Sequence, residues 1–183
     1  MTREWWKDGV VYQIYSSSFK DSNGDGIGDI PGITSELDYI KSLGVDIIWM
    51  CPSYKSPQYD MGYDLSDFRD VYEKYGTVAD VDALIKGCHD RGMRVIFDRQ
   101  SSSSKKNPRH DWYIWRPARY LFGGSVWEWD ENVGEYYLHL WAKEQPDLNW
   151  DNPEVRKAIY DNAMRFWPDK GADGLIRESR FGY

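Results

Sequence analysis

Residues 30–50, IPGITSELDYIKSLGVDIIWM, contain the pattern that decides the fold. Apolar residues recur at helical spacing at positions 30, 33, 37, 40 and 43, and a proline at position 31 lies close to the start of this predicted helix. Gly44 ends the helix, and the run DIIWM at 46–50 has the length and apolar character of a buried strand. The segment therefore predicts a helix that is followed directly by a β-strand.

The order helix, glycine, strand occurs three times, with the glycines at positions 44, 92 and 171. Two of the helices have clear start signals, a Thr77/Asp80 capping box in one and Asn152 followed by Pro153 in the other. The four predicted strands cover residues 10–15, 46–50, 94–98 and 175–176. Strands that alternate with helices indicate an α/β protein with a parallel sheet.

The segment after the third strand interrupts this order. QSSSSKK at 100–106 is typical of an exposed loop, and two short aromatic strands are predicted at 126–130 and 135–141. A closed (β/α)₈ barrel takes about 250 residues, so a chain of 183 residues does not close one alone. Open α/β sheets of this size also exist, and both interpretations stay open on the repeat pattern alone.

Composition excludes several classes of protein. The chain is 41% hydrophobic and 29% charged, which is typical of one globular domain. Its net charge of −7 argues against nucleic acid as a partner, and no apolar run is long enough to span a membrane. The first residues do not resemble a signal peptide, and two cysteines are too few for a disulfide framework. We therefore expect a cytoplasmic protein.

Aromatic residues are unusually common. They make up 16% of the chain, with 10 Trp, 14 Tyr and 6 Phe, and many stand beside Asp, Asn, Gly or Pro. Aromatic side chains among polar ones suit a cleft that stacks sugar rings. They are equally suited to filling a core, and composition does not decide between these interpretations.

The loop DSNGDGIGD at 21–29 has the spacing of a calcium loop. Oxygen-bearing side chains stand at positions 1, 3, 5 and 9 of the loop, a glycine at position 6 and a backbone carbonyl at position 7. The predicted Ca²⁺ ligands are Asp21, Asn23, Asp25, Ile27 through its carbonyl, and Asp29. Position 12 is Gly32 where an EF-hand has glutamate, so the loop is not an EF-hand. A Gly/Asp turn without an ion is the alternative.

Seven motifs, taken in order, carry a family resemblance. They are WWK (5–7), VYQIY (11–15), FKDSNGDGIGD (19–29), YKSP (54–57), DMGYD (60–64), DWYIWRP (111–117) and QPDLNW (145–150). The chain resembles the α-glucosidases of glycoside hydrolase family 13, above all the maltases and oligo-1,6-glucosidases, over the first part of their catalytic domain. The resemblance implies an α/β fold, a partial (β/α)₈ (TIM) barrel of about four strands with a shortened insertion after strand three, and a calcium site at the loop described above.

This resemblance divides the chain into three parts. Residues 1–98 would form the first part of the barrel, 99–150 the shortened insertion, and 151–183 the resumed helix and fourth strand, at which the barrel is truncated. The insertion is expected to be shortened twice, once after Asp98 and once near residue 121.

The function implied by the resemblance is hydrolysis of terminal α-linked glucose, with α-glucoside oligosaccharides as substrates. Asp60 and Tyr63 match the positions that hold the terminal glucose, Asp60 by hydrogen bonds and Tyr63 by stacking. From the residues alone, a carboxylate and an aromatic ring in a loop after a strand suit the polar rim and apolar face of a sugar. A surface loop with a satisfied aspartate is the alternative.

The catalytic positions depart from the family pattern. The Asn and His expected after Asp98 are missing. At the fourth strand the family has Gly, apolar, Arg, apolar, Asp, whereas this chain has Gly-Leu-Ile-Arg-Glu at 174–178. Ile176 therefore replaces the arginine, and Glu178 stands in the register of the nucleophile. Pro168 is also expected to break the preceding helix near its end.

Retaining hydrolysis requires two carboxyl groups about 5–5.5 Å apart. The family's general acid follows its fifth strand, and this chain has four predicted strands, so we expect no activity from the chain alone. The alternative function is a non-catalytic, calcium-stabilised fragment that binds carbohydrate or another protein. A half barrel also exposes strand edges, which predicts self-association.

Overall fold

A parallel sheet forms the centre of the computed structural model, which describes residues 4–99, 110–117, 126–140 and 142–177. Within these residues its strands run in the order β1-β2-β5-β9, and every neighbouring pair is parallel. The strands are β1 (Val11–Ile14), β2 (Ile47–Met50), β5 (Arg94–Arg99) and β9 (Gly174–Arg177). The four predicted strands and the α/β class are confirmed.

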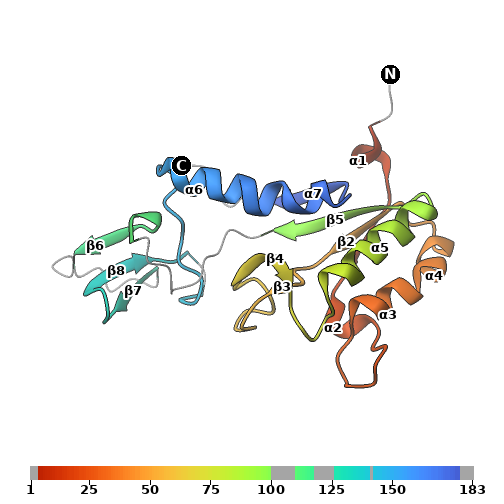
Figure 1. The fold of residues 1–183 in the computed structure, drawn as a ribbon, viewed down its shortest axis with the longest axis horizontal. Helices are drawn as coiled ribbons and strands as arrows, with labels where there is room; N and C mark the ends of the chain where they lie inside the picture. Colours follow the sequence, from red (N-terminus) through yellow and green to blue (C-terminus); the bar gives the residue numbers. More distant parts are fainter. Residues whose placement is uncertain (1–3, 100–109, 118–125, 141, 178–183) are drawn as a thin grey trace.

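Helices α3 (Ile30–Ser35), α4 (Leu37–Ser42) and α5 (Val78–Asp90) lie together beside the sheet (Figure 1). The sequence predicts one helix where the structure has α3 and α4, which meet at Glu36. The hydroxyl groups of Thr34 and Ser35 donate to carbonyls of the preceding turn. Such side-chain bonds bend helices, which accounts for the break. Helix α5 begins at the predicted capping box, with reciprocal bonds between Thr77 and Asp80.

A second helical segment follows the insertion (Figure 1) and comprises α6 (Pro153–Ile159), a π-helical turn η2 (Tyr160–Met164) and α7 (Phe166–Asp169). Asn152 caps α6 as predicted, since its side chain accepts from the backbone N–H of Glu154. The predicted break is present, but it lies at Arg165, upstream of Pro168. Pro168 has no N–H to donate to the carbonyl of Met164, so α7 starts afresh with the proline in its first turn.

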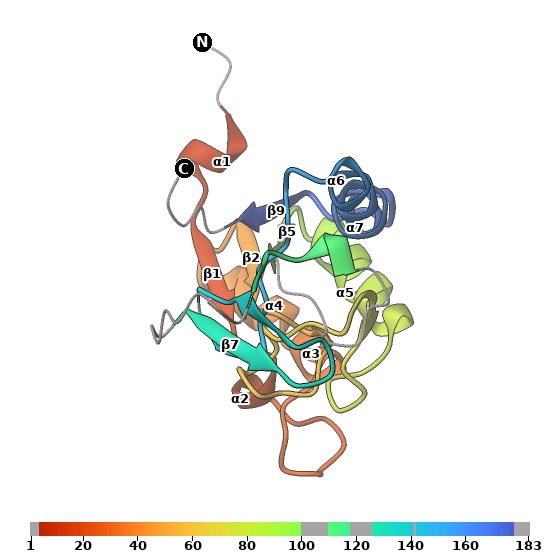
Figure 2. The ribbon, with the colours of Figure 1, turned by 90° about the vertical axis from the view of Figure 1, so that its left-hand side faces the viewer.

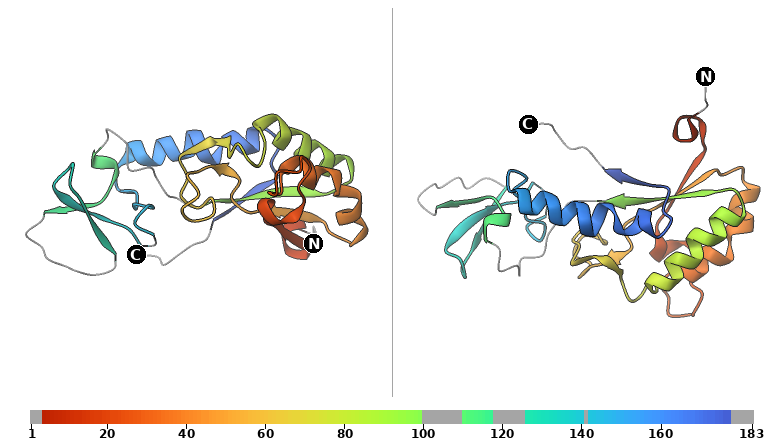
Figure 3. Two further views of the ribbon diagram at one scale, coloured as in Figure 1. Left: turned by 90° about the horizontal axis from the view of Figure 1, so that it is seen from below. Right: turned by 45° about the horizontal axis from the view of Figure 1, so that its top comes forward.

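The insertion contains a small antiparallel sheet of order β6-β8-β7. Its strands are β6 (Trp115–Pro117), β7 (Trp127–Asp130) and β8 (Glu135–Leu138), preceded by the short helix η1 (His110–Trp112). Strands β7 and β8 were predicted, although β8 is shorter than expected; β6 was not predicted. This sheet lies at the end of an elongated molecule opposite α3 and α4, as Figures 1 and 3 show. The boundaries at 98 and 150 stay a prediction.

The remaining elements are short. They are helices α1 (Trp5–Asp8) and α2 (Ser16–Phe19), and the hairpin strands β3 (Tyr54–Lys55) and β4 (Asp67–Val71) that follow β2. No helix in the described residues is long and apolar enough to cross a membrane. Figure 2, seen from the insertion end, shows the parallel sheet beyond β7.

Aromatic residues serve the core as well as the surface. Trp167 in α7 is 1% exposed, its ring stacks on Phe97 of β5 at 5.4 Å, and its Nε1 donates to the carbonyl of Phe68 in β4 at 2.8 Å. In contrast, Tyr59 in the loop after β2 is 73% exposed. The core interpretation is therefore confirmed for Trp167, whereas the stacking of sugar rings stays a prediction.

Candidate functional site

Polar side chains meet where β5 ends and where the chain continues from β2. Asp98, near the end of β5, is buried, and its Oδ2 accepts a hydrogen bond of 2.9 Å from the hydroxyl of Tyr63. Tyr63 belongs to the loop 58–64, which lies between the hairpin strands β3 and β4. The carboxyl ends of parallel strands are where barrel folds place their reacting groups. The structure thus brings the predicted residue Tyr63 to a buried carboxylate at that edge.

Asp60 is held from the insertion. Its Oδ2 accepts a 2.7 Å hydrogen bond from Nε2 of Gln145, in the QPDLNW motif. Gln145 is 3% exposed, and its Oε1 has no hydrogen-bond partner among the described residues. Asp60 and Gln145 are 85 positions apart, so no local pattern could have indicated this contact. Asp98 stands at the end of a predicted strand, and this position is the sequence signal that indicates a site residue there.

Hydrogen bonds to Asp64 stabilise the conformation of the loop 58–64. Asp64 is buried, and its two carboxylate oxygens accept from the hydroxyl of Ser56 at 2.8 Å and from the backbone N–H groups of Tyr59 and Asp60 at 2.9 and 3.1 Å. Gly62 has φ 98°, and a Cβ there would lie 2.7 Å from the carbonyl oxygen of Pro52. Only glycine fits this position without strain, and it permits the turn that presents Asp60 and Tyr63.

The phenol groups of this site stay protonated at neutral pH. Burial, followed by the hydrogen bond to Asp98, raises the pKa of Tyr63 far above its ordinary value. Burial is also the largest cause that raises the pKa of Tyr15 to about 12, and the Tyr15 hydroxyl donates to the carbonyl of Met61 at 2.9 Å. Both groups therefore act as hydrogen-bond donors rather than as bases.

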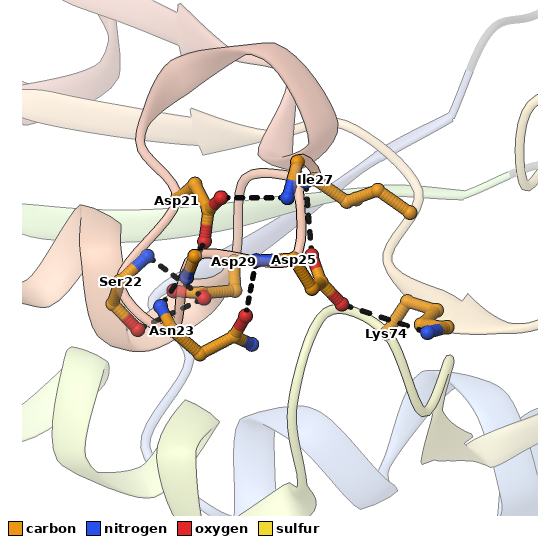
Figure 4. Close-up of polar contacts among 9 residues, drawn as sticks. Asp21, Ser22, Asn23, Asp25, Ile27, Asp29 and Lys74 are labelled. Atoms are coloured by element: carbon orange, nitrogen blue, oxygen red, sulfur yellow. Dashed lines mark hydrogen bonds and ion pairs between the residues drawn. The ribbon is translucent and has the colours of Figure 1, made fainter.

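In the predicted calcium loop, side-chain oxygens accept hydrogen bonds from backbone N–H groups of the same loop (Figure 4). Asp21 accepts from three backbone N–H groups of the loop at 2.6–3.1 Å, Asn23 Oδ1 accepts from the N–H of Asp25, and Asp25 Oδ1 from that of Ile27, both at 2.9 Å. These backbone bonds, above all the one from the Gly26 N–H, lower the pKa of Asp21. The loop therefore has an ionised, half-buried carboxylate at its first position.

Asp29, the last predicted ligand, has a different environment. It is 2% exposed; its Oδ1 caps α3 by accepting from the N–H of Gly32 at 2.6 Å, and its Oδ2 accepts from the N–H and hydroxyl of Ser22. Lys74 lies 3.5 Å from Oδ2 of Asp25 (Figure 4). In the part of the chain that is described, no three His, Cys, Asp or Glu side chains form a cluster that could hold a metal ion. Calcium binding stays a prediction.

The fourth strand brings Ile176 beside the site. Ile176 is the register partner of Asp98 in the β5–β9 pair, so an apolar residue stands next to Asp98 where the family pattern has arginine. Glu178, the residue in the register of the nucleophile, lies outside the described residues, as do the expected shortenings after Asp98 and near residue 121.

Comparison with known proteins decides the family. Residues 13–177 match the catalytic domain of α-amylase. The chain belongs to the α-amylase family. It is 55% identical to the α-glucosidase of Candida albicans over 199 aligned positions, and 51% identical to the oligo-1,6-glucosidase of Parageobacillus thermoglucosidasius over 197 positions. These alignments cover 94% and 96% of the chain and 35% of each relative.

Solved structures of the α-amylase family give the same result. A variant of the isomaltulose synthase of Erwinia rhapontici NX5, in complex with D-glucose, superposes with a TM-score of 0.87 at 48% identity over 94% of this chain and 35% of that protein. A second variant, in complex with sucrose, has a TM-score of 0.88 at 47% identity, over 96% of this chain and 35% of that protein. The predicted family and the partial barrel are thereby confirmed.

The chain spans about a third of the length of these relatives. The alignments also extend over more positions than the 183 residues of the chain. Residues are therefore missing within the matched segment, in agreement with the expected internal deletions.

Proposed function

We propose that this chain supplies the glucose-binding part of an α-glucosidase site, and that it binds the terminal α-linked glucose of an oligosaccharide without hydrolysing it alone. The observation that carries this proposal is the hydrogen bond between Tyr63 and buried Asp98, beside Asp60 held by Gln145. Support also comes from the relatives, which include α-glucosidases and oligo-1,6-glucosidases.

The chemistry of the three residues fits a pyranose ring. The aromatic ring of Tyr63 matches the apolar face of the sugar, while carboxylate oxygens accept hydrogen bonds from its hydroxyl groups. Because three hydrogen bonds to buried Asp64 hold the loop, little conformational entropy is lost when the sugar binds. The site is therefore preorganised for recognition.

Hydrolysis needs more than recognition. A nucleophile and a general acid must lie about 5–5.5 Å apart, and a misplacement of about 1 Å can lower the rate about 10²-fold. Glu178 has one methylene more than the aspartate of the family, and the general acid corresponds to none of these 183 residues. We therefore assign turnover only to a protein that provides the second carboxyl group.

Two tyrosines of the same loop give a matched test of sugar binding. Maltose is titrated while tryptophan fluorescence is recorded, for the wild type, Tyr63→Ala and Tyr59→Ala. Tyr59 is 73% exposed, so its removal should leave the affinity unchanged, whereas Tyr63→Ala should weaken binding at least tenfold. Equal affinities of the two variants, or no quenching of the wild type at millimolar maltose, would contradict the proposal.

Turnover is tested separately with a chromogenic α-glucoside. The wild-type chain should release no chromophore at any pH between 4 and 9, even where maltose quenches its fluorescence. Release that disappears in Glu178→Gln would show an active enzyme and would overturn the proposed inactivity. Release that persists in Glu178→Gln would come from a contaminating enzyme, and the preparation would be repeated until it is free of it.

We also propose that the loop 21–29 binds calcium, which would stabilise the fold. Its donors would be carboxylate, amide and carbonyl oxygens at the spacing of a calcium loop. An oxygen that accepts one N–H still has a lone pair for a cation. Calcium should raise the melting temperature followed by near-UV circular dichroism, and Asp21→Ala together with Asp25→Ala should remove the increase. An identical melt in calcium and in excess chelator would contradict this.

A further inference from the structure

Lys74 brings a positive charge to the predicted calcium loop 21–29. Its ammonium nitrogen lies 3.5 Å from Oδ2 of Asp25, and the two side chains are 50% and 30% exposed (Figure 4). Lys74 belongs to the segment 72–77 between β4 and α5, far from the loop in the sequence. The fold therefore creates this ion pair, and the spacing of the loop residues does not predict it.

The backbone beside Lys74 is anchored to the end of the loop. The carbonyl of Tyr75 accepts from the N–H of Ile30 at 2.8 Å, and Ile30 directly follows Asp29, the last residue of the loop. Tyr75 is 4% exposed, so its side chain is packed in the core. The backbone of Lys74 therefore has a fixed place near the loop, while its half-exposed, flexible side chain can move.

The two carboxylate oxygens of Asp25 have different partners. Oδ1 accepts from the N–H of Ile27 at 2.9 Å, within the loop. Oδ2 faces Lys74, and no backbone N–H of the described residues donates to it. A side chain at the fifth position of a calcium loop supplies an oxygen to the ion. Oδ2 is therefore the oxygen that Asp25 can offer to calcium, and the ammonium group of Lys74 stands in for a cation beside it.

Lys74 also changes the charge that a metal ion would meet at the loop. The loop contains the carboxylates of Asp21, Asp25 and Asp29. Among the described residues, Lys74 is the one cationic side chain that forms an ion pair with any of them. The nearest lysine in the sequence, Lys20, pairs with Glu36 instead. Lys74 therefore partly neutralises the loop.

We propose that Lys74 competes with calcium for Asp25 and thereby limits the calcium affinity of the loop 21–29. This inference rests on the proposed calcium binding and adds the residue that opposes it. A divalent ion at Oδ2 of Asp25 would be repelled by an ammonium group a few ångströms away. Calcium therefore binds only when the Lys74 side chain moves away from Asp25, and the ion pair is lost at that step.

Calcium affinities of three variants test the role of Lys74 by calorimetric titration. Lys74→Met keeps an unbranched side chain but removes the charge, so it should bind calcium more tightly than the wild type, by about fivefold or more. Lys74→Arg keeps the charge and should bind about as tightly as the wild type. Lys86→Met is the matched control, because it changes the net charge equally, whereas the ion pair of Lys86 is with Asp90 of α5. Its affinity should equal that of the wild type.

The charge of the metal ion gives a second readout that a change in packing would not move. Electrostatic repulsion is proportional to the charge of the ion, so the gain in affinity of Lys74→Met over the wild type should be larger for trivalent terbium than for calcium. Terbium luminescence sensitised by aromatic residues measures this affinity. Added salt should reduce both gains, because it screens exposed charges. Equal gains for the two ions that do not depend on salt would overturn the proposal.

The outcomes separate the role of Lys74 from calcium binding itself. Equal calcium affinities of the wild type, Lys74→Met and Lys86→Met would overturn the role of Lys74 and leave calcium binding in place. No binding of calcium or terbium by any of these proteins at millimolar ion would overturn both. Each variant should melt close to the wild type in chelator, because exposed ion pairs contribute little to stability, and circular dichroism checks this. The proposal is supported when Lys74→Met alone gains affinity.

Discussion

Two aspartate-rich loops of this protein look alike in sequence and differ in the hydrogen-bond partners of their side chains. In the loop 21–29, the half-buried Asp21 accepts hydrogen bonds from the nearest backbone groups of its own loop. In the loop 58–64, buried Asp64 accepts the hydrogen bonds from the loop backbone. Asp60 and Tyr63 instead form side-chain hydrogen bonds with residues 85 and 35 positions away in the sequence. The comparison shows that the local sequence predicts a turn in both loops, whereas only the folded structure shows which side chains meet residues far away in the sequence.

The largest effect is expected from removing the buried support of the second loop. Asp64→Ala leaves two N–H groups and the Ser56 hydroxyl without their acceptor, which should lower the free energy of unfolding by about 3 kcal/mol. Urea denaturation measures the change. The control Asp67→Ala removes an exposed carboxylate that, within the described parts of the chain, accepts from the Arg69 N–H, and it should cost at most about 0.5 kcal/mol. An equal decrease in the free energy of unfolding for the two variants would contradict the supporting role of Asp64.

The buried aspartate of the first loop should give an intermediate effect. Asp29→Ala removes the cap of α3 and the acceptor for Ser22, which should cost about 1–2 kcal/mol in urea denaturation. Asp29→Asn keeps an acceptor for the Gly32 N–H and should recover part of the loss. A variant as stable as the wild type would mean that the loop does not depend on its cap.

The smallest effect is a pH dependence of the first loop. Backbone hydrogen bonds lower the folded-state pKa of Asp21 below its unfolded value of about 3.9. The stabilisation is therefore complete above that unfolded value and is lost as the pH falls through the folded-state pKa. Between pH 5 and pH 2, the melting temperature of Asp21→Asn should decrease slightly less than that of the wild type. Identical pH profiles would contradict the lowered pKa.

Much of the fold follows from local patterns. The capping box at Thr77, the Asn152 cap and the strand-length runs predicted the main elements, because each depends on residues within a few positions. The break at Glu36 was missed because the hydroxyl groups of two neighbouring residues compete for helix carbonyls, which hydrophobic periodicity does not record. Strand β6 was missed because its three residues pair only through the insertion sheet.

The candidate site was harder to predict. Asp60 and Tyr63 came from a motif, and the structure adds what the motif could not contain, the bonds to Gln145 and Asp98. These contacts form only when the insertion and β5 fold against the loop after β2. Glu178 and the calcium ligands remain predictions, to be tested by the experiments proposed above.

The most direct test of the central claim compares one aspartate from each loop in a calorimetric titration with maltose. The account predicts that Asp60→Asn lowers the affinity at least tenfold, because this carboxylate accepts from sugar hydroxyl groups, and that Asp21→Asn binds as tightly as the wild type. The contradicting result is an Asp60→Asn variant that binds maltose like the wild type, which would mean that the Asp60 carboxylate does not contact the sugar.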